Sequence, residues 1–535
     1  GNYAVKKFLL NTPANINLNW VDKLRIEQEF KRMPDSTWVL ANENTYVNFY
    51  IVKGAQQLYA HQLRNFDKYQ FDVQNADSIF GLLGPIHELP EATAQTDTFW
   101  IHNRHVPLKE KESALDDLLA QLRKVPAFNV IIKTAEILIT GYIPTTADKD
   151  KSKFDFGPMN TTFSANHLEG FRMRVGGMTT ANLNPHWFGS GYLAYGVNDR
   201  KLKYNANSVN KKKYHEGESP VNNISAIQEY DVYTPGQDFL FTSKDNMFVA
   251  WKVGEPVTMM QYIRKTMLQY QKEWLNGLTL TTWARNENNE APGTLRYDRY
   301  NADGTLTNLK SFTNTELGAQ LRFAPGERAY NGREGKNSLF NLSKDAPVFK
   351  LSHQMGLKNV LGGDFNYNHT EISAEKRIWL SSFGHIDALV TAGKVWDKVP
   401  FPLLIMPNTN QSITIQPQAF NMMRALEFVS DQYVSFYWIL NRIPGVKWLR
   451  LREVISFSGF YGGLTDKNNP ALDPTGLYRF PEGTSPMGRT PYLEASVGLE
   501  NIFKILRIDY YRRLTYLDQP NIKKGGVRIA LRFSF

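Results

Sequence analysis

The sequence contains no cysteine among its 535 residues. A disulfide framework, a thiolate zinc site and a cysteine nucleophile are therefore excluded. The sequence also lacks an uninterrupted apolar run of the roughly 18 residues that a transmembrane helix needs. The best candidate, "NVIIKTAEILITGYI" at 129–143, is short and carries Lys133 and Glu136. With a mean hydropathy of −0.42, a helical membrane protein is not expected.

The signatures of common catalytic and nucleotide-binding sites are missing as well. There is no G-x-S-x-G elbow, H-E-x-x-H helix, P-loop or G-x-G-x-x-G after a strand. The ten histidines are dispersed, and the one close pair, His102 and His105, has no nearby carboxylate or third ligand. We therefore predict no catalytic residue, no metal site and no cofactor, and we do not expect an enzyme.

The chain has an excess of basic residues, with 62 Lys and Arg against 52 Asp and Glu. These residues are scattered, and no nucleic-acid-binding motif accompanies them. Nucleic acid is therefore not an expected partner.

Aromatic residues are abundant, at 13% of the chain, and they recur in alternating segments. The chain ends with "KGGVRIALRFSF" at 524–535. A period of two indicates a strand with one apolar and one polar face. The apolar row is Val527, Ile529, Leu531, Phe533 and Phe535. Arg528 and Arg532 point the other way.

The two preceding segments place charges of both signs on the polar face. Glu494 and Glu500 alternate with apolar residues in "PYLEASVGLE", and Arg507 and Asp509 do so in "LRIDYY". A soluble sheet could carry such charges outward. In outer-membrane barrels the apolar row faces lipid, the polar row faces the lumen, and aromatic residues mark the interfaces. Only a closed barrel pairs every backbone group of strands in hydrocarbon.

These patterns predict an all-β fold, a transmembrane antiparallel barrel of about 16 strands over 146–535, an even number as in bacterial barrels. The candidate strands are 153–163, 170–180, 186–197, 202–211, 224–233, 258–272, 276–287, 313–323, 347–356, 364–380, 385–396, 431–440, 451–462, 491–501, 505–516 and 524–535. Residues 1–145 are predicted as a small mixed periplasmic region, with a β-rich module and an amphipathic helix at 111–125.

The connection at 397–430 is too apolar for a solvated loop. We expect it to fold inward or over the mouth of the barrel. Glu494, Glu500, Asp509, Arg507, Arg528 and Arg532 are predicted as a lumen charge network. The same groups could form an acid/base site, but charge compensation inside a barrel is the preferred interpretation.

A set of short segments resembles an uncharacterised family of outer-membrane barrels found mainly in Bacteroidota, the carboxypeptidase-regulatory-like-domain-containing proteins. Among these segments are "DTFWIHNRHVPLKEKE" (97–112), "LEGFRMRVGG" (168–177), "AGKVWDKVPFPLL" (392–404), "NRIPGVKWLRLREVISF" (441–457) and "LTDKNNP" (464–470). The resemblance implies membership of the wider superfamily of BamA-like and two-partner-secretion barrels, in which the connection between strands 11 and 12 enters the lumen.

Two functional residues follow from this resemblance. The superfamily carries an Arg-Gly motif in the inward loop, and "NMMRALEF" (421–428) offers Arg424 and Phe428, with Ala425 in place of the glycine. A C-terminal alternating strand that ends in Phe resembles the signal read by the barrel-assembly machinery, which recognises its clients by β-augmentation.

The resemblance implies an integral protein of the bacterial outer membrane with its N-terminal domain in the periplasm. We predict a role in envelope biogenesis, assisting the assembly or export of outer-membrane or surface proteins within a complex. A gated channel for small solutes and a barrel-anchored scaffold are the alternatives. The expected partners are outer-membrane lipids, lipopolysaccharide, the barrel-assembly machinery and other outer-membrane proteins or lipoproteins.

Overall fold

The computed structural model describes most of the chain. The described ranges are 4–12, 21–49, 58–71, 95–103, 141–146, 151–211, 221–240, 242–253, 257–274, 276–327, 329–331, 339–341, 345–442 and 451–532, with single positions between 74 and 140. The predicted helix at 111–125 lies outside the described residues. Within them, no helix has the length and apolar character that crossing a membrane requires.

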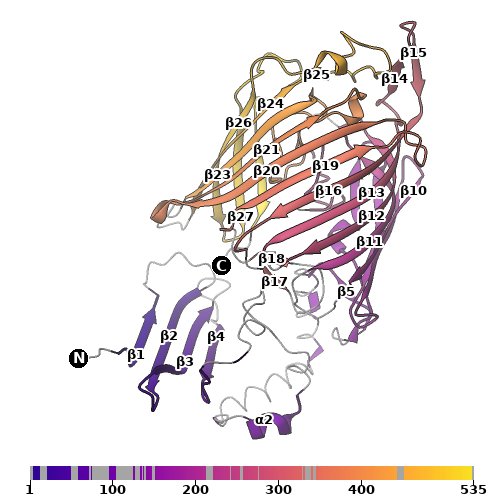
Figure 1. Ribbon diagram of the computed structural model, residues 1–535. Coiled ribbons are helices and arrows are strands. Elements are labelled where there is room, and N and C mark those ends of the chain that lie inside the picture. Colours follow the sequence, from indigo (N-terminus) through magenta and orange to yellow (C-terminus); the bar gives the residue numbers. More distant parts are fainter. Residues whose placement is uncertain are drawn as a thin grey trace.

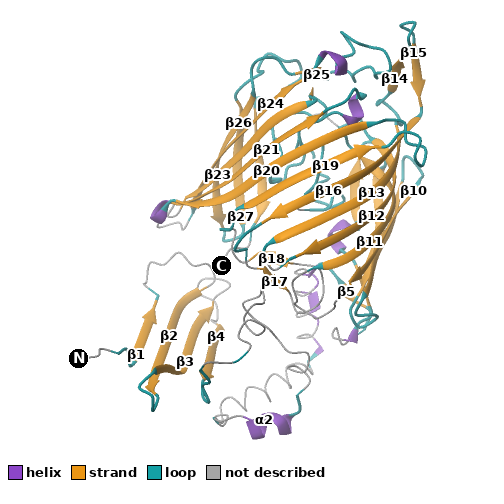
Figure 2. Cartoon of the chain, viewed as in Figure 1, coloured by secondary structure: helices purple, strands orange, loops and turns teal. Residues whose placement is uncertain are grey.

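The C-terminal part of the chain folds as an antiparallel barrel (Figures 1 and 2). Its strands follow the chain from neighbour to neighbour, as period-two segments joined by turns should. They are β5 (Ile143–Pro144), β6 (Phe154–Phe156), β7 (Phe163–Asn166), β8 (Gly170–Thr179), β9 (Trp187–Gly196), β10 (Leu202–Lys211), β11 (Asn222–Tyr233), β12 (Gln261–Glu273), β13 (Leu278–Glu290), β16 (Ser311–Phe323), β19 (Val348–Gly356), β20 (Tyr367–Trp379), β21 (Gly384–Val395), β23 (Gln432–Arg442), β24 (Arg452–Gly463), β26 (Tyr492–Ile502), β27 (Leu506–Arg513) and β28 (Gly525–Leu531).

The interval predicted as the first strand, 153–163, is divided in the structure. β6 pairs with residues 177–179 of β8, and β7 pairs with residues 170–173 of the same strand. The two-residue strand β5 pairs with β6, so the barrel sheet begins shortly before residue 146. In the order of strands, β5 stands between β28 and β6.

Alternation along the strands separates an apolar outer face from a charged lumen. On β8, Met173 and Val175 are 51% and 67% exposed, whereas Arg172 between Phe171 and Met173 is fully buried. On β27, Tyr510 is 46% exposed, whereas Asp509 beside it is fully buried. The buried side chains of these strands are therefore the charged ones, the reverse of an ordinary soluble protein.

Residues 7–65 form a separate four-stranded antiparallel sheet. Its strands are β1 (Lys7–Asn11), β2 (Val21–Arg32), β3 (Trp38–Phe49) and β4 (Leu58–Asn65), paired in chain order. A short helix, α2 (Asp97–Asn103), follows.

Several long connections lie at one end of the barrel. This end carries the hairpin of β14 (Tyr297–Tyr300) and β15 (Leu306–Leu309), and the short strand β25 (Ser485–Pro486) (Figure 1). We call it the β25 end. Two of its connections matter below: residues 234–260, the β11–β12 loop, and residues 397–430, the inward loop.

Candidate functional site

The inward loop packs into the lumen through apolar side chains. Phe420, Met423 and Phe428 are at most 1% exposed and cluster with Phe460 and Tyr492 of the barrel wall. Phe420 lies 5.5 Å from Tyr492, measured between ring centroids, in an edge-on arrangement. This packing accounts for the apolar composition of the loop, since large buried aromatic pairs stabilise one another beyond their burial.

Charged groups of the wall bind the backbone of the inward loop. Glu494 accepts hydrogen bonds from the N–H groups of Asn421, at 2.8 Å, and Met422, at 2.9 Å. The Tyr492 hydroxyl donates to the same carboxylate at 2.9 Å. Arg528 Nη2 donates to the Asn421 carbonyl oxygen at 2.6 Å. Glu494 and Arg528 therefore hold the donor and acceptor groups of one short segment.

A buried ion pair provides a third attachment. Arg513 Nη2 and Nη1 donate to the two oxygens of Glu427 at 2.7 and 3.0 Å, and both side chains are fully buried. Bidentate pairs of this kind are the strong, directional ones. We call Glu494, Arg513 and Arg528 the loop anchors. Arg513 was not singled out from the sequence, although it lies on the polar face of its strand.

The six residues predicted as one charge network fall into two groups. Arg507 donates to both oxygens of Asp509, at 2.8 and 2.5 Å, and Arg532 donates to Glu500 at 3.1 Å. Arg507 Nη1 lies 3.9 Å from Glu500, which joins these four residues. Glu494 and Arg528 instead serve the inward loop. Alternation identified the lumen face but not the partner of each charge.

A second set of lumen charges surrounds Arg172 at the first strands. Arg172 contacts Glu169 at 2.9 Å, Asp231 at 2.6 Å and Asp245 at 3.2 Å. We call this set the Arg172 cluster. It contains five basic and five acidic side chains: Arg172, Arg174, Lys203, Lys244 and Lys265 with Glu169, Asp199, Glu229, Asp231 and Asp245.

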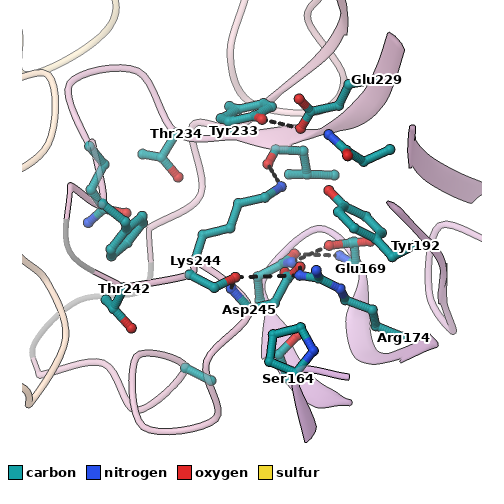
Figure 3. A pocket seen from close by; sticks show the side chains of 18 of the residues that line it. Ser164, Glu169, Arg174, Tyr192, Glu229, Tyr233, Thr234, Thr242, Lys244 and Asp245 are labelled. Carbon is teal, nitrogen blue, oxygen red and sulfur yellow. Dashed lines mark hydrogen bonds and ion pairs between the residues drawn. The ribbon is translucent and has the colours of Figure 1, made fainter. Parts of the chain in front are cut away.

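Five members of the Arg172 cluster line a cavity of about 590 Å³ between the first strands and the β11–β12 loop (Figure 3): Glu169, Arg174, Glu229, Lys244 and Asp245. Lys244 and Asp245 reach into it from the loop, and Tyr233 donates to Glu229 from the wall (Figure 3). Lys244 Nζ contacts Asp231 at 2.8 Å and donates to the Val232 carbonyl at 2.6 Å. Because every carboxylate of the cluster has a basic partner, the arrangement compensates charge rather than presenting a free acid or base.

Metal binding and cofactor binding stay predictions of absence. No group of three or more metal-ligating side chains is present in the part of the chain that the structure describes. The absence of a catalytic function stays a prediction.

The residues predicted from the C-terminal strand lie on the outer face of β28. Val527 and Leu531 are 48% and 57% exposed, and Ile529 lies between them. Phe533 and Phe535 lie outside the described residues.

The backbone of Ile529 pairs with the inward loop. Its N–H donates to the Ile413 carbonyl at 2.9 Å, and its carbonyl accepts from the Ile415 N–H at 2.8 Å. Thr414 and Ile529 thus form a parallel bridge on the edge of β28 that faces away from β27.

The opposite side of the same loop segment pairs with the β11–β12 loop. Val253 N–H donates to Gln411 at 2.8 Å, and Ile413 N–H donates to Trp251 at 2.7 Å. The β11–β12 loop in turn reaches the first-strand region, where Met247 N–H donates to Asn160 at 3.1 Å. The two loops therefore connect Ile529 of β28 with the first-strand region, next to β5, which is the neighbour of β28 in the barrel order.

Arg424 differs from the loop anchors because its side chain does not attach the inward loop to the barrel wall through a described ion pair. Its backbone N–H donates to Glu427 at 2.9 Å, but no described carboxylate pairs with its guanidinium. The resemblance pointed to this residue, yet the fully buried ion pair of this loop is formed by Glu427.

Comparisons with known proteins give one family and a set of similar barrels. Residues 135–467, more than half of the chain, match a family described as "Family of unknown function (DUF5686) C-terminal domain". No curated protein matches the sequence. The narrower resemblance to Bacteroidota proteins with a carboxypeptidase-regulatory-like domain stays a prediction.

Two solved structures illustrate the structural likeness. BamA from Haemophilus ducreyi lacking POTRA domains 1–3 is 10% identical, with a TM-score of 0.43, covering 71% of this chain and 70% of that one. CdiB from Acinetobacter baumannii is 11% identical, with a TM-score of 0.34, covering 69% of this chain and 58% of that one. At such low scores we draw no functional conclusion from either structure.

Proposed function

We propose that this chain, which belongs to the family of unknown function DUF5686, is an integral outer-membrane barrel that acts in envelope biogenesis. In this proposal it assists the assembly or export of outer-membrane or surface proteins within a complex, and its N-terminal domain lies in the periplasm. The support comes from the two faces of the wall and from the edge of β28.

The outer face supports insertion in a membrane. Leu193, Leu351 and Val497, on strands around the barrel, are 56%, 47% and 60% exposed. The hydrophobic effect disfavours such rows in water by roughly 25 cal/mol for each Å² of exposed apolar surface. In hydrocarbon the same rows are stable, and the charged lumen stays enclosed.

The observation that carries the functional proposal is the pairing of Ile529 with residues 413–415. An extended segment that adds to a sheet edge is β-augmentation, the mode by which edges recognise other chains. At Ile529, β28 pairs with an extended segment that the inward loop supplies, beside β5, its neighbour in the barrel order. We propose that an incoming strand of an outer-membrane protein replaces this loop segment during assembly.

A reversible crosslink tests the proposal. Cysteines at Thr414 and Ile529 have no competing thiols in this cysteine-free sequence. Oxidation should lock the loop on β28 and lower the abundance of other outer-membrane proteins in cells that depend on this variant, and reduction should restore it. The single-cysteine variants serve as controls. An unchanged outer-membrane proteome, both in the locked cells and after deletion of the gene, would contradict an assembly role.

The cavity of about 590 Å³ in the lumen favours a second candidate, a gated channel for small solutes. In that case the inward loop is the gate. Planar bilayers containing the purified barrel should then show steady conductance that increases when residues 397–430 are deleted. A scaffold that is merely anchored by its barrel predicts no conductance and an intact partner complex when lumen charges are neutralised.

The proposed partners follow from location. Lipids and lipopolysaccharide would cover the outer face, and the C-terminal strand would be the signal for the barrel-assembly machinery. Purification of the intact complex from native membranes tests whether outer-membrane proteins or lipoproteins accompany the chain.

A further inference from the structure

Four arginines are among the largest fully buried side chains of the described residues, and one of them lacks an anion. Arg172, Arg507 and Arg513 have carboxylate oxygens at 2.6, 2.5 and 2.7 Å. The fourth, Arg528, is 2% exposed, and no carboxylate oxygen of the described residues lies within 4.0 Å of it. Burial of a charge without a counterion is strongly unfavourable.

The hydrogen bonds of Arg528 do not supply the missing charge. Nη2 donates to the Asn421 carbonyl at 2.6 Å and Nη1 to the Val527 carbonyl at 3.1 Å, while Nε has no partner. The oxygens of Glu494 already accept from two backbone N–H groups and from Tyr492. Glu494 therefore acts on Arg528 only from beyond ion-pair distance, and no anion is bound directly to the guanidinium.

Arg528 lines a cavity of about 370 Å³, together with Arg424 and Lys523. The connections that form this cavity all belong to the β25 end of the barrel. Of the two arginines that line this cavity, Arg424 also lacks a described carboxylate partner. Its Nε is buried and has no hydrogen-bond partner. The carboxylate in the lining, Glu482, is exposed. Three basic groups therefore meet one acidic group here, whereas the Arg172 cluster is balanced.

The packing around Arg424 limits the positions of its guanidinium. A Cβ added to Gly483 would lie 3.6 Å from Arg424 Nη2, so the guanidinium faces the side of Gly483 that lacks a side chain. Gly483 has a φ of 79°, a conformation that other residues rarely adopt. A guanidinium placed in this way is suited to a planar, two-point contact with an oxyanion.

We propose that this cavity is a binding site for a phosphate group, held by Arg424 and Arg528 with Lys523 at its margin. A phosphate carries up to two negative charges and enough oxygens for two arginine forks, whereas a carboxylate carries one charge and two oxygens. The volume is within the range of about 300 to 1,000 Å³ typical of small-molecule sites. A phosphate on a sugar or other small group therefore fits the class of ligand.

Titration of the full chain with inorganic phosphate, in zwitterionic nanodiscs, tests the proposal by calorimetry. We expect saturable binding that Arg424→Gln and Arg528→Gln each weaken by about tenfold or more, since each removes a charge-assisted contact. Arg424→Lys should retain part of the affinity. Arg512→Gln, on the outer face next to Arg513, is the matched control and should bind like the native protein.

Two results would overturn the site. One is phosphate binding that is unchanged in both glutamine variants, or absent altogether. The other is competition by acetate as effective as that by phosphate. Arg424→Gln keeps the test valid if Arg528→Gln fails to fold, because Arg424 lies in a loop and makes no described ion pair.

The source of the phosphate is resolved by competition. Displacement by glucose 1-phosphate supports a phosphate carried on a soluble small molecule. Displacement only by phosphatidic acid in the nanodisc supports a lipid headgroup. The site does not depend on the assembly role, so the Thr414–Ile529 crosslink and the phosphate titration can fail independently.

Discussion

The Arg172 cluster and the loop anchors both place charges in the lumen, but they use them differently. In the Arg172 cluster, side chains pair with side chains, and Arg172 alone contacts three carboxylates. Among the loop anchors, Glu494 and Arg528 bind backbone groups of the inward loop. Side-chain clusters tolerate small shifts of the chain, whereas backbone contacts require one loop conformation. The first region therefore stabilises the wall, and the second selects the position of a loop.

The largest effect is expected from Arg172→Ala. The substitution leaves Glu169 and Asp231 buried with fewer basic partners, which costs about 5 kcal/mol, the upper end for breaking a buried pair. Urea unfolding of the purified barrel, followed by tryptophan fluorescence, measures the change. Arg264→Ala, which removes an arginine from the outer row of β12, should shift the unfolding free energy by no more than about 0.5 kcal/mol. Similar values for both variants would contradict a central role for Arg172.

A slightly smaller loss is expected from Arg513→Ala, about 3 kcal/mol, because Glu427 is then buried alone. The double variant Arg513→Met with Glu427→Met should recover much of this loss, since neither charge is stranded. The same unfolding measurement on the single and double variants gives the interaction free energy between Arg513 and Glu427. Additive single effects would mean that the pair does not act as a unit.

Glu494→Gln should have an effect of about 2 kcal/mol, because the amide keeps one acceptor oxygen and its NH2 group cannot accept from the second backbone N–H group. Its clearer consequence is a looser inward loop. A cysteine at Ala425 should react faster with a maleimide in the Glu494→Gln background than in the native one. Glu500→Gln is the control, since Glu500 pairs with Arg532 and Arg507 rather than with the loop. Equal rates in both backgrounds would argue against Glu494 as a loop anchor.

A separate, pH-dependent effect concerns Lys252, in the β11–β12 loop beside the paired segment 411–413. Burial lowers the pKa of Lys252 from 10.5 to about 8. Between these two pKa values the unfolded chain binds more protons than the folded one, so stability should rise as the pH increases from about 8 to 10.5. Lys252→Met should flatten that rise. A slope that is identical in both proteins would contradict the lowered pKa.

The sequence was sufficient for the features that depend on local alternation. Met173 and Val175 point outward and Arg172 inward because a strand has a period of two, and the same holds for Tyr510 and Asp509. The all-β fold follows from repetition of this pattern. The contact of Arg507 with Asp509 could also be predicted, since the two residues lie on one face of a strand, two positions apart.

Contacts between distant parts of the chain could not be predicted from the sequence. Asp231 is far from Arg172 along the chain, and Glu427 is far from Arg513, so no periodicity pairs them. The division of the first strand into β6 and β7 was missed, although Gly157 and Pro158 interrupt the alternating pattern between them. The pairing of Thr414 with Ile529 has no local signature, since one residue is in a connection and the other is at the end of the chain.

The bridge between residues 413–415 and Ile529 also constrains the order of events during biosynthesis. The loop segment leaves the ribosome well before the last strand, so its hydrogen-bonding partner does not yet exist when the preceding strands are made. Seating of this loop segment must therefore await synthesis of β28. A nascent chain stalled before β28 would lack Ile529 and would leave the Ile413 carbonyl and the Ile415 N–H group without these hydrogen bonds.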